Sequence, residues 1–426
     1  MFTMHIFFSG IAGAGISALA AIAQDVGENV SGSDLAESLA SLELEKRGID
    51  IVYEQTPESI AAEHLANPID WLVYTAALPD DAPELVFAHK HGIRISKRDE
   101  FLAEFITDHN LRLVAVSGTH GKTTTTGMLI WAAQKLGLPI SYAIGTTLSF
   151  GPSGQYDPAA EYFIYEADEY DRNLLHFSPT IALLPSVDYD HADIYPTVDD
   201  YKAVFRQFID QSNQTLMFKQ TFDYLQLTTD ETIEVFEHTT TRDEINLAGQ
   251  HMRDNAYLAA AALKAIDGYT DSELYKILSD FPGTSRRFEK LADNLYTDYA
   301  HHPAEIAATI QLARELADHM VVIYQPHQNL RQVELADEYR DAFDGTEKVY
   351  WVPTYLARDD LVNGAPAVLT PNDLIAKLSD PDIAEPAELN DELWQQIEQD
   401  RTNGALVLVM GAGPIDGWAR GKMHDA

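Results

Sequence analysis

The feature that most constrains the fold is a glycine-rich turn in the stretch LRLVAVSGTHGKTTTTGMLIW, residues 111–131. Its first six residues are apolar and rich in β-branched side chains, which is typical of a buried parallel strand. Gly118 and Gly121 allow successive backbone N–H groups to point at phosphate oxygens. Lys122 adds a positive charge, and Thr123 offers a hydroxyl to Mg²⁺. The stretch therefore predicts a nucleotide-triphosphate loop in an α/β domain.

The loop matches the generic phosphate-loop pattern only in part, and it has an alternative interpretation. A generic phosphate loop has a glycine where this chain has Val116, so only the second half of that pattern is matched. The alternative is a tight, threonine-rich turn between a strand and a helix that binds nothing. We consider it weaker, because a lysine inside a buried turn requires an anion.

Composition limits the class of protein. The chain has 426 residues, which indicates two or three domains. Its 67 acidic and 29 basic residues give a formal charge of −38, which argues against nucleic acid or an anionic membrane as a partner. Without cysteine it can form neither a disulfide nor a thiolate metal site. It lacks a run of about 20 apolar residues, and we expect a cytoplasmic protein. The acidity is compatible with a salt-rich habitat or with a merely acidic protein.

A second glycine-rich turn, SGIAGAG, links a predicted strand at 4–8 to a predicted helix at 16–26. A helix N-terminus behind such a turn suits an anion, and Asp34, about twenty residues later, suits a ribose hydroxyl. Strands predicted at 70–75 and 93–96 continue the alternation of strand and helix. The pattern indicates a Rossmann-like domain, and a dehydrogenase would look much the same in this region.

Acidic side chains follow the next predicted strands. The strand at 162–165 runs into EADEYD at 166–171, which places four carboxylates within six residues. They would repel one another unless a cation lay among them, although a solvated acidic loop is the alternative. The strand predicted at 180–185 leads to an acid–histidine pair, Asp190 and His191. We interpret the two strand ends as a metal site beside the phosphate loop. The glycine- and proline-rich stretch between the loop helix and these strands, residues 151–158, is expected to be an exposed loop.

The remaining chain predicts a third parallel sheet. Its strands are predicted at 294–298, 320–324 and 405–410. Tyr299 and His301 follow the first of them, and His327 and Arg331 follow the second, at the carboxyl edge where ligands bind. Upstream, an alanine-rich helix opens at LAGQHMRDN, and two adjacent arginines follow in FPGTSRRFE. In a chain so poor in cations, these arginines favour phosphate or ribose contacts over a solvated pair.

Several of these stretches resemble the Mur ligases, the amide-forming enzymes that build the peptide of bacterial cell-wall precursors. SGTHGKTTT at 117–125 is similar to their ATP loop, and the stretches EADEYD, DYAHHP and QPHQNLR occur in the family's order. The resemblance implies three α/β domains: a Rossmann-like UDP-binding domain at 1–108, a central P-loop ATPase domain with a mainly parallel sheet at 109–288, and a Rossmann-like amino-acid-binding domain at 289–426.

The resemblance also assigns ligands to residues. ATP is expected at Gly118, Thr119, His120, Gly121, Lys122, Thr123, Thr124, Asn255, Arg287 and Asp298. The UDP-sugar is expected at Gly13, Ala14, Gly15, Asp34, Thr75, Arg98, Asp168 and Glu169. The amino acid is expected at Tyr299, His301, His327 and Arg331, and Mg²⁺ at Thr123, Glu166 and His191. The residues expected to act in catalysis are Lys122, Glu166, His191, His327 and Arg331.

The implied activity is the ATP-dependent joining of L-alanine to the carboxylate of UDP-N-acetylmuramate. Several Mur ligases carry a carbamylated lysine on the helix after the acid–histidine pair, but here that place falls near Phe205 or Arg206, as expected of the alanine-adding branch. Gln328 stands where many members have arginine, and Met252 replaces an asparagine. The alternatives are a ligase that attaches a recycled peptide to the same UDP-sugar, another Mur-type ligase, and, more remotely, a nucleotide-binding protein that is not a ligase.

Overall fold

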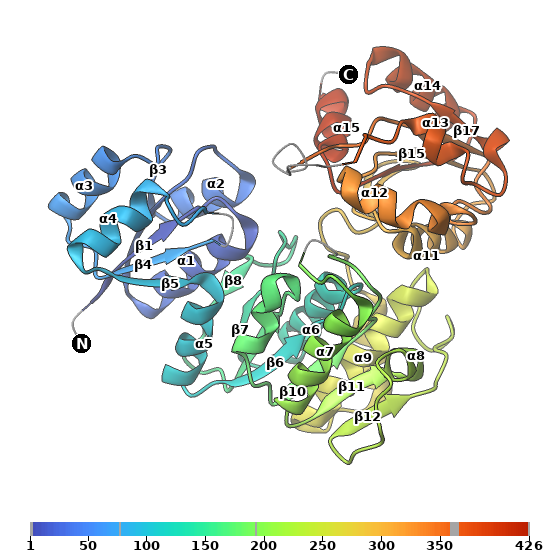
Figure 1. Ribbon diagram of the computed structural model, residues 1–426. Coiled ribbons are helices and arrows are strands. Elements are labelled where there is room, and N and C mark those ends of the chain that lie inside the picture. The colour runs from blue at the N-terminus through green and yellow to red at the C-terminus, as the bar shows by residue number, and fades with distance from the viewer. Residues whose placement is uncertain (1–2, 76–77, 192–193, 358–365, 425–426) are drawn as a thin grey trace. The chain divides into compact units, whose positions relative to one another are not determined.

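The computed structural model describes residues 3–75, 78–191, 194–357 and 366–424. The chain forms two compact units: Met1–His238 with Tyr257–Pro282, and Thr239–Ala256 with Gly283–Ala426. The first unit contains two sheets and the second contains one, and helices flank each sheet (Figure 1). None of the helices in the described ranges is long and apolar enough to cross a membrane.

The N-terminal sheet is entirely parallel, in the order β3-β2-β1-β4-β5. Its strands are β1 (His5–Ser9), β2 (Asn29–Ser33), β3 (Asp50–Val52), β4 (Trp71–Tyr74) and β5 (Arg94–Lys97). Its helices are α1 (Ala14–Val26), α2 (Leu39–Lys46), α3 (Pro57–Ala66), α4 (Pro83–His91) and α5 (Arg98–Asp108). Successive strand residues face opposite sides. Ile6 and Phe8 therefore pack in the core that holds α1 and α5, and Phe7 packs with α3 and α4.

The second sheet has the order β12-β11-β10-β6-β9-β7-β8, with only β8 antiparallel to its neighbour. Its strands are β6 (Arg112–Val116), β7 (Ile140–Ala143), β8 (Gly154–Gln155), β9 (Tyr162–Glu166), β10 (Ile181–Leu184), β11 (Thr215–Phe218) and β12 (Ile233–Phe236). The accompanying helices are α6 (Lys122–Leu136), η1 (Tyr170–His176), α7 (Val198–Asp210), α8 (Lys219–Tyr224), α9 (Gln250–Asp267) and α10 (Asp271–Ser279). Because β6 lies between β9 and β10, the carboxyl ends of all three strands meet at one edge.

The prediction of an exposed loop at residues 151–158 is wrong at its centre, where Gly154 and Gln155 form a strand. Gly154 is buried in β8, which pairs with β7 and contacts α1. A Cβ atom at Gly154 would lie 2.2 Å from the carbonyl oxygen of Ala18, so only glycine allows this approach. Composition indicated a loop because glycine and proline mark turns, but here a glycine marks a close contact between backbones.

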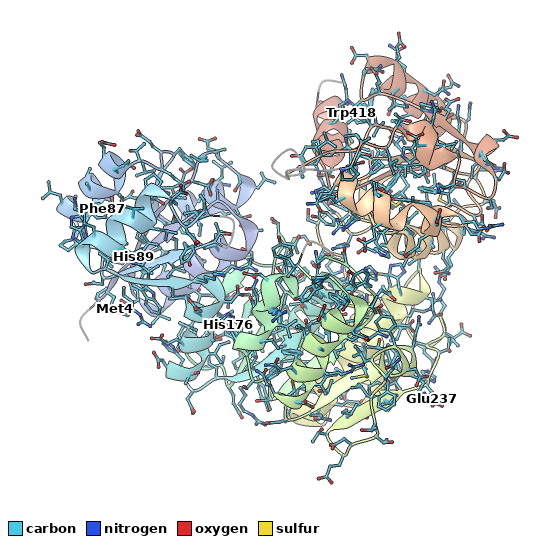
Figure 2. All side chains as sticks on the ribbon, viewed as in Figure 1. Met4, Phe87, His89, His176, Glu237 and Trp418 are labelled. Carbon is cyan, nitrogen blue, oxygen red and sulfur yellow. The ribbon has the colours of Figure 1, made fainter. Side chains whose placement is uncertain are left out.

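The third sheet has the order β13-β14-β18-β15-β16-β17, and β13 alone is antiparallel to its neighbour. Its strands are β13 (Glu289–Ala292), β14 (Leu295–Asp298), β15 (Met320–Tyr324), β16 (Lys348–Trp351), β17 (Ala384–Pro386) and β18 (Leu406–Met410). Its helices are α11 (Pro303–Arg314), α12 (Asn329–Leu335), η2 (Ala336–Tyr339), α13 (Pro371–Ile375), η4 (Pro381–Ile383), α14 (Asp391–Thr402) and α15 (Ile415–His424). On one side of the sheet, Trp418 of α15, labelled in Figure 2, packs edge-to-face against Trp394 of α14.

An ion pair anchors the start of α9 within the second unit. Arg253, whose side chain is 8% exposed, donates to both carboxylate oxygens of Glu315 at 2.9 and 3.0 Å. The guanidinium also donates to the carbonyl oxygens of Thr240 and Leu247. The hydrogen bonds from Arg253, with a further one from Gln311, lower the pKa of Glu315 to about 2.

We predict that Glu315→Gln destabilises the second unit at neutral pH by about 1.5–3 kcal/mol, the range for a hydrogen bond to a charged group. A carboxyl whose pKa is depressed by folding stabilises the protein above its unfolded value of 4.5, and this contribution is lost as the pH falls toward about 2. The denaturation midpoints of variant and wild type should therefore differ at pH 7 and converge as the pH approaches about 2. Lys290→Ala, which removes an exposed pair with Asp293, should change the midpoint little.

Candidate active site

The phosphate loop requires glycine at two positions. β6 ends at Val116 and α6 begins at Lys122, so the five intervening residues must turn sharply. Gly118 has φ 136° and Gly121 has φ 84°, a region that favours glycine. A Cβ atom at Gly118 would lie 2.5 Å from the carbonyl oxygen of Ser186, just past β10. The loop is thus pressed against the end of the neighbouring strand.

Thr119 fixes the loop to the segment after β10. Its backbone N–H donates to Ser186 O at 2.9 Å, and its hydroxyl donates to Asp188 O at 2.6 Å and accepts from Asp188 N at 2.9 Å. His120 lies beside the same acid, with its Nε2 atom 3.5 Å from Asp188 Oδ2. The side chains of both Thr119 and His120 are therefore used to hold the loop.

Thr123 and Glu166 come together at the start of α6. The Thr123 hydroxyl donates to Glu166 Oε1 at 2.6 Å, and Gly145 N donates to Glu166 Oε2 at 3.0 Å. Hydroxyl and carboxylate oxygens are ligands that suit Mg²⁺. Within the described part of the chain, no three or more His, Cys, Asp or Glu side chains are grouped to hold a metal ion. A cation here would therefore complete its shell with phosphate oxygens and water.

Lys122 is neutralised within the protein. Its Nζ atom lies 2.8 Å from Glu169 Oε2, and His191 Nε2 lies 3.3 Å from the other oxygen of Glu169. Burial opposes the charged form of Lys122, but Glu169 and Asp168 outweigh it and raise the pKa of the lysine. Burial likewise opposes the charge on Glu169, but Lys122 and His191 lower the pKa of this acid. The structure thus groups His191 with Glu169 and Lys122, whereas Thr123 bonds Glu166.

Asp168 connects this region to the N-terminal sheet. Its Oδ2 atom lies 3.3 Å from Nη2 of Arg98, whose Nε bonds the buried Asp99 at 3.0 Å. A Cβ atom at Gly15 would lie 2.4 Å from Arg98 Nη1, so the guanidinium covers the start of α1. Of the two acids expected at the UDP-sugar, Asp168 therefore faces the N-terminal turn, and Glu169 faces the phosphate loop.

The N-terminal turn is tightly held. Gly10 N and Ile11 N both donate to Ser33 O, at 2.8 and 2.9 Å, and Ala12 N donates to Asp34 Oδ2 at 2.9 Å. Gly10 has φ 82°, and a Cβ atom there would lie 2.6 Å from Thr75 Cγ2. Asp34 and Thr75 therefore shape the turn itself. Gly13 caps α1, and Ala14 and Gly15 begin it, at a helix N-terminus whose backbone N–H groups favour an anion.

In the second unit the four side chains expected at the amino acid form one row. The rings of Tyr299 and His301 lie 5.4 Å apart, those of His301 and His327 lie 6.0 Å apart, and His327 Nδ1 is 3.4 Å from Arg331 Nη1. They come from the segment after β14 and from the segment after β15 into α12. Gln328, next to His327, has φ 62°, a strained conformation for a residue with a side chain.

Three residues expected at ATP also lie in this unit. Asp298 is buried, and its carboxylate accepts from Phe288 N at 2.7 Å and from Ala300 N at 2.8 Å. Burial raises the pKa of Asp298, while Arg287 acts in the opposite direction. The Arg287 guanidinium lies over the Tyr299 ring, 4.9 Å from its centroid. Asn255 is buried in α9.

Arg286, next to Arg287 in the chain, was also expected from the sequence to contact a phosphate or ribose. It donates to Gly411 O at 2.9 Å and so holds the turn after β18 in place.

Sequence reasoning missed two residues that line this row. Glu305 Oε2 lies 3.3 Å from His301 Nδ1 and accepts from His301 N at 3.1 Å. The spacing of His302 and Glu305 is that of a capping box, a signal that would have located this acid at the start of α11. The ring of Tyr355 lies 5.8 Å from that of His327, and its carbonyl accepts from Gln328 N. Its sequence context gave no signal.

Comparisons with known proteins agree with the fold and the order of these sites. Three family models match successive parts of the chain. They are described as "Mur ligase family, catalytic domain" (residues 5–110), "Mur ligase middle domain" (116–228) and "Mur ligase, glutamate ligase domain" (286–413). The UDP-N-acetylmuramate–L-alanine ligase of Roseiflexus castenholzii is 31% identical, over 99% of this chain and 96% of that protein. The same-named ligase of Mycolicibacterium smegmatis is 31% identical, over 96% and 92%.

Among solved structures, the UDP-N-acetylmuramate-alanine ligase of Thermotoga maritima superposes with a TM-score of 0.77 at 24% identity, covering 99% of both chains. A murein peptide ligase of Psychrobacter arcticus gives 0.68 at 24% identity, covering 99% of this chain and 98% of that one. At these identities the structures establish the fold alone, and they confirm the predicted α/β architecture of three domains with mainly parallel sheets. Together with the full-length relatives, they show that the chain belongs to the Mur ligase family.

Proposed function

We propose that this chain is an ATP-dependent ligase that joins L-alanine to the carboxylate of UDP-N-acetylmuramate during the synthesis of peptidoglycan precursors. The observation that carries the proposal is similarity along nearly the whole chain, at about 30% identity, to curated ligases of that name. The arrangement of Lys122, Thr123 and Glu166 at the end of β6 and β9 supports it, because it provides a lysine and oxygen donors beside a phosphate loop.

The chemistry explains why ATP is needed. A carboxylate is a poor electrophile, so its oxygen must first take the γ-phosphoryl group of ATP to give an acyl phosphate and ADP. The amine then attacks the carbonyl carbon, and phosphate leaves with the oxygen that joined it to the carbonyl. The protein contributes positioning and charge neutralisation rather than a nucleophile. Mg²⁺, which Thr123 and Glu166 would hold, supplies further neutralisation of the phosphate charge.

We assign the remaining steps to the chain's own residues. Lys122 leaves Glu169 and binds phosphate oxygens, and Glu169 then remains paired with His191. The amine must lose a proton before it attacks, and we assign this proton to His327 or His301, whose rings lie near each other. Glu305 beside His301 would stabilise the protonated imidazole.

The cytoplasm is the compartment that fits a reaction consuming ATP and a UDP-sugar. The domain boundaries that fit these roles are those expected from sequence, at 108/109 and 288/289. Both remain part of the proposal.

A panel of acceptors tests the function. Phosphate release from ATP should require UDP-N-acetylmuramate together with an amino acid, and L-alanine should give the highest kcat/KM. Glycine and serine should be accepted less well: glycine lacks a methyl contact, which discriminates by about 1–3 kcal/mol, and serine adds a hydroxyl, which an apolar pocket rejects only weakly. A clear preference for a tripeptide would instead assign the chain to the recycling ligases, and phosphate release without any UDP-sugar would contradict a ligase role.

Arg331 is predicted to bind the carboxylate of the incoming amino acid. Lysine keeps the charge but lacks the planar fork of guanidinium, so Arg331→Lys should raise the KM for L-alanine about tenfold or more while changing the KM for ATP little. The exposed Arg340 of the same unit offers a matched control, and Arg340→Lys should leave both constants unchanged. An unaltered KM for L-alanine in Arg331→Lys would remove this arginine from the amino-acid site.

A further inference from the structure

A buried carboxyl group lies beneath the N-terminal glycine turn. Glu84, in the first turn of α4, is 1% exposed. Its Oε2 atom accepts a hydrogen bond from the hydroxyl of Ser9, and the hydroxyl of Ser33 also bonds this carboxyl group. Its Oε1 atom is buried and has no hydrogen-bond partner among the residues that the structure describes. This acid has no part in the proposed reaction.

The two serines are the link between Glu84 and the turn. Ser9 is the last residue of β1 and Ser33 the last of β2. The carbonyl oxygen of Ser33 accepts both Gly10 N and Ile11 N, and the carbonyl oxygen of Ser9 accepts Thr75 N at 3.3 Å. The residues whose hydroxyls meet at Glu84 thus carry the carbonyls that hold the turn in place.

The surroundings of Glu84 favour its protonated form. An ionised carboxylate that is fully buried with one oxygen unpaired is very costly. Burial is the main cause that raises the pKa of Glu84, and the negative charge of Asp34 adds to it, while the Ser33 and Ser9 hydroxyls act in the opposite direction. Gln55, which donates to the Ser33 hydroxyl at 3.3 Å, is a polar neighbour of the serines that does not titrate. Among the described residues, Asp34 is the charged group that acts on Glu84.

We propose that Glu84 is a positioning residue of the UDP-sugar site, which acts as a neutral carboxylic acid that joins the ends of β1 and β2 beneath the anion-binding turn. In this form it holds Ser9 and Ser33 without placing a second negative charge, beside Asp34, close to the pyrophosphate. Ionisation would place this second charge beneath the turn and repel the ligand. The inference rests on the proposed function, because it takes a UDP-sugar as the ligand of the turn.

The affinity for UDP-N-acetylmuramate, measured by calorimetry between pH 5 and 8.5, tests this role. The pyrophosphate diester keeps its charge throughout this range. In the wild type the affinity should fall as the pH rises through the raised pKa of Glu84, approaching tenfold for each pH unit if binding requires the protonated acid. Glu84→Gln, which is neutral and of the same shape, should match the wild type at low pH and bind with little pH dependence. Glu84→Ala should bind weakly at every pH.

Glu63→Gln is the matched control, because Glu63 bonds Ser31, two residues earlier on β2, and does not touch the turn. This variant should keep the pH dependence of the wild type. Equal pH profiles of wild type and Glu84→Gln would overturn the inference.

A second measurement separates this inference from the proposed function. An acid whose pKa is raised by folding contributes most stability below its unfolded value of 4.5, and this contribution is lost as the pH rises through the folded value. The denaturation midpoint of Glu84→Gln should therefore rise relative to the wild type over that window, without any ligand present. If this shift is found but wild type binds no UDP-sugar, the proposed function fails. If wild type binds and only the pH profile of binding is flat, the positioning role fails alone.

Discussion

Lys122→Ala is expected to reduce ligation by at least about 10²- to 10³-fold, the range for removing one preorganised charge-stabilising group, while the affinity for UDP-N-acetylmuramate changes little. Lys122 is the first residue of α6 and follows the phosphate loop, which comes after β6 of the second sheet. The turn expected to bind the UDP-sugar lies between β1 of the N-terminal sheet and α1. Turnover should be measured by product formation and UDP-sugar affinity by calorimetry. Equal loss of both would contradict the assignment of the two phosphate sites to different domains.

Two controls are needed for this variant, since Lys122 is also the partner of the buried Glu169. Removing one member of a buried ion pair is destabilising in its own right. The denaturation midpoint of Lys122→Ala should be compared with that of Lys122→Ala/Glu169→Gln, in which the unpaired charge is absent; both should be inactive. Lys135→Ala, at the exposed far end of the same helix, should retain wild-type turnover.

Glu166→Ala is expected to lower turnover by orders of magnitude at low Mg²⁺ and to raise the Mg²⁺ concentration needed for half-maximal rate. The carboxylate bonds the Thr123 hydroxyl, and together they are the oxygen donors expected to hold the cation. Without it, the phosphate charge faces Asp168 and Glu169 with less compensation.

Titration of turnover with MgCl₂ checks this prediction. Glu161→Ala removes an exposed acid of the segment before β9 that pairs with Arg112, and its Mg²⁺ dependence should equal that of the wild type. If Glu166→Ala kept wild-type turnover at low Mg²⁺, the carboxylates after β9 would be no more than an acidic loop.

His191→Ala distinguishes the Thr123–Glu166 pair from the group formed by Lys122, Glu169 and His191. Because His191 faces Glu169, the substitution should weaken ATP binding more than it raises the Mg²⁺ requirement.

Much of the architecture could be predicted because the pattern was local. Short continuous apolar runs predicted β1, β9, β15 and β18 within a residue or two of their observed bounds. Glycine-rich turns after β1 and β6 located both turns that are expected to bind anions, since glycine readily adopts the positive φ angles of Gly10 and Gly118. Even the row from Tyr299 to Arg331 followed from the rule that the ends of parallel strands meet at one edge.

The rest depended on contacts between distant segments. Lys122 and Glu169 lie 47 positions apart, and only the packing of β6 between β9 and β10 decides that Glu169 faces the lysine while Asp168 faces Arg98. Composition predicted a loop where β8 lies, because it cannot distinguish a glycine at a turn from a glycine that allows the backbone of α1 to approach the strand. Glu84 gave no signal at all, since an acid in the first turn of a helix is usual on the surface.

The path of one oxygen atom tests the central claim most directly. UDP-N-acetylmuramate labelled with oxygen-18 in its carboxylate should be incubated with ATP, Mg²⁺ and L-alanine, and the released phosphate and the UDP-sugar product should be analysed by mass spectrometry. The proposed reaction predicts that each phosphate carries one labelled oxygen, that the product gains the mass of one alanyl residue, and that it retains the other label in its new amide. Unlabelled phosphate, or phosphate release without the alanylated product, would contradict an acyl phosphate route to UDP-N-acetylmuramoyl-L-alanine.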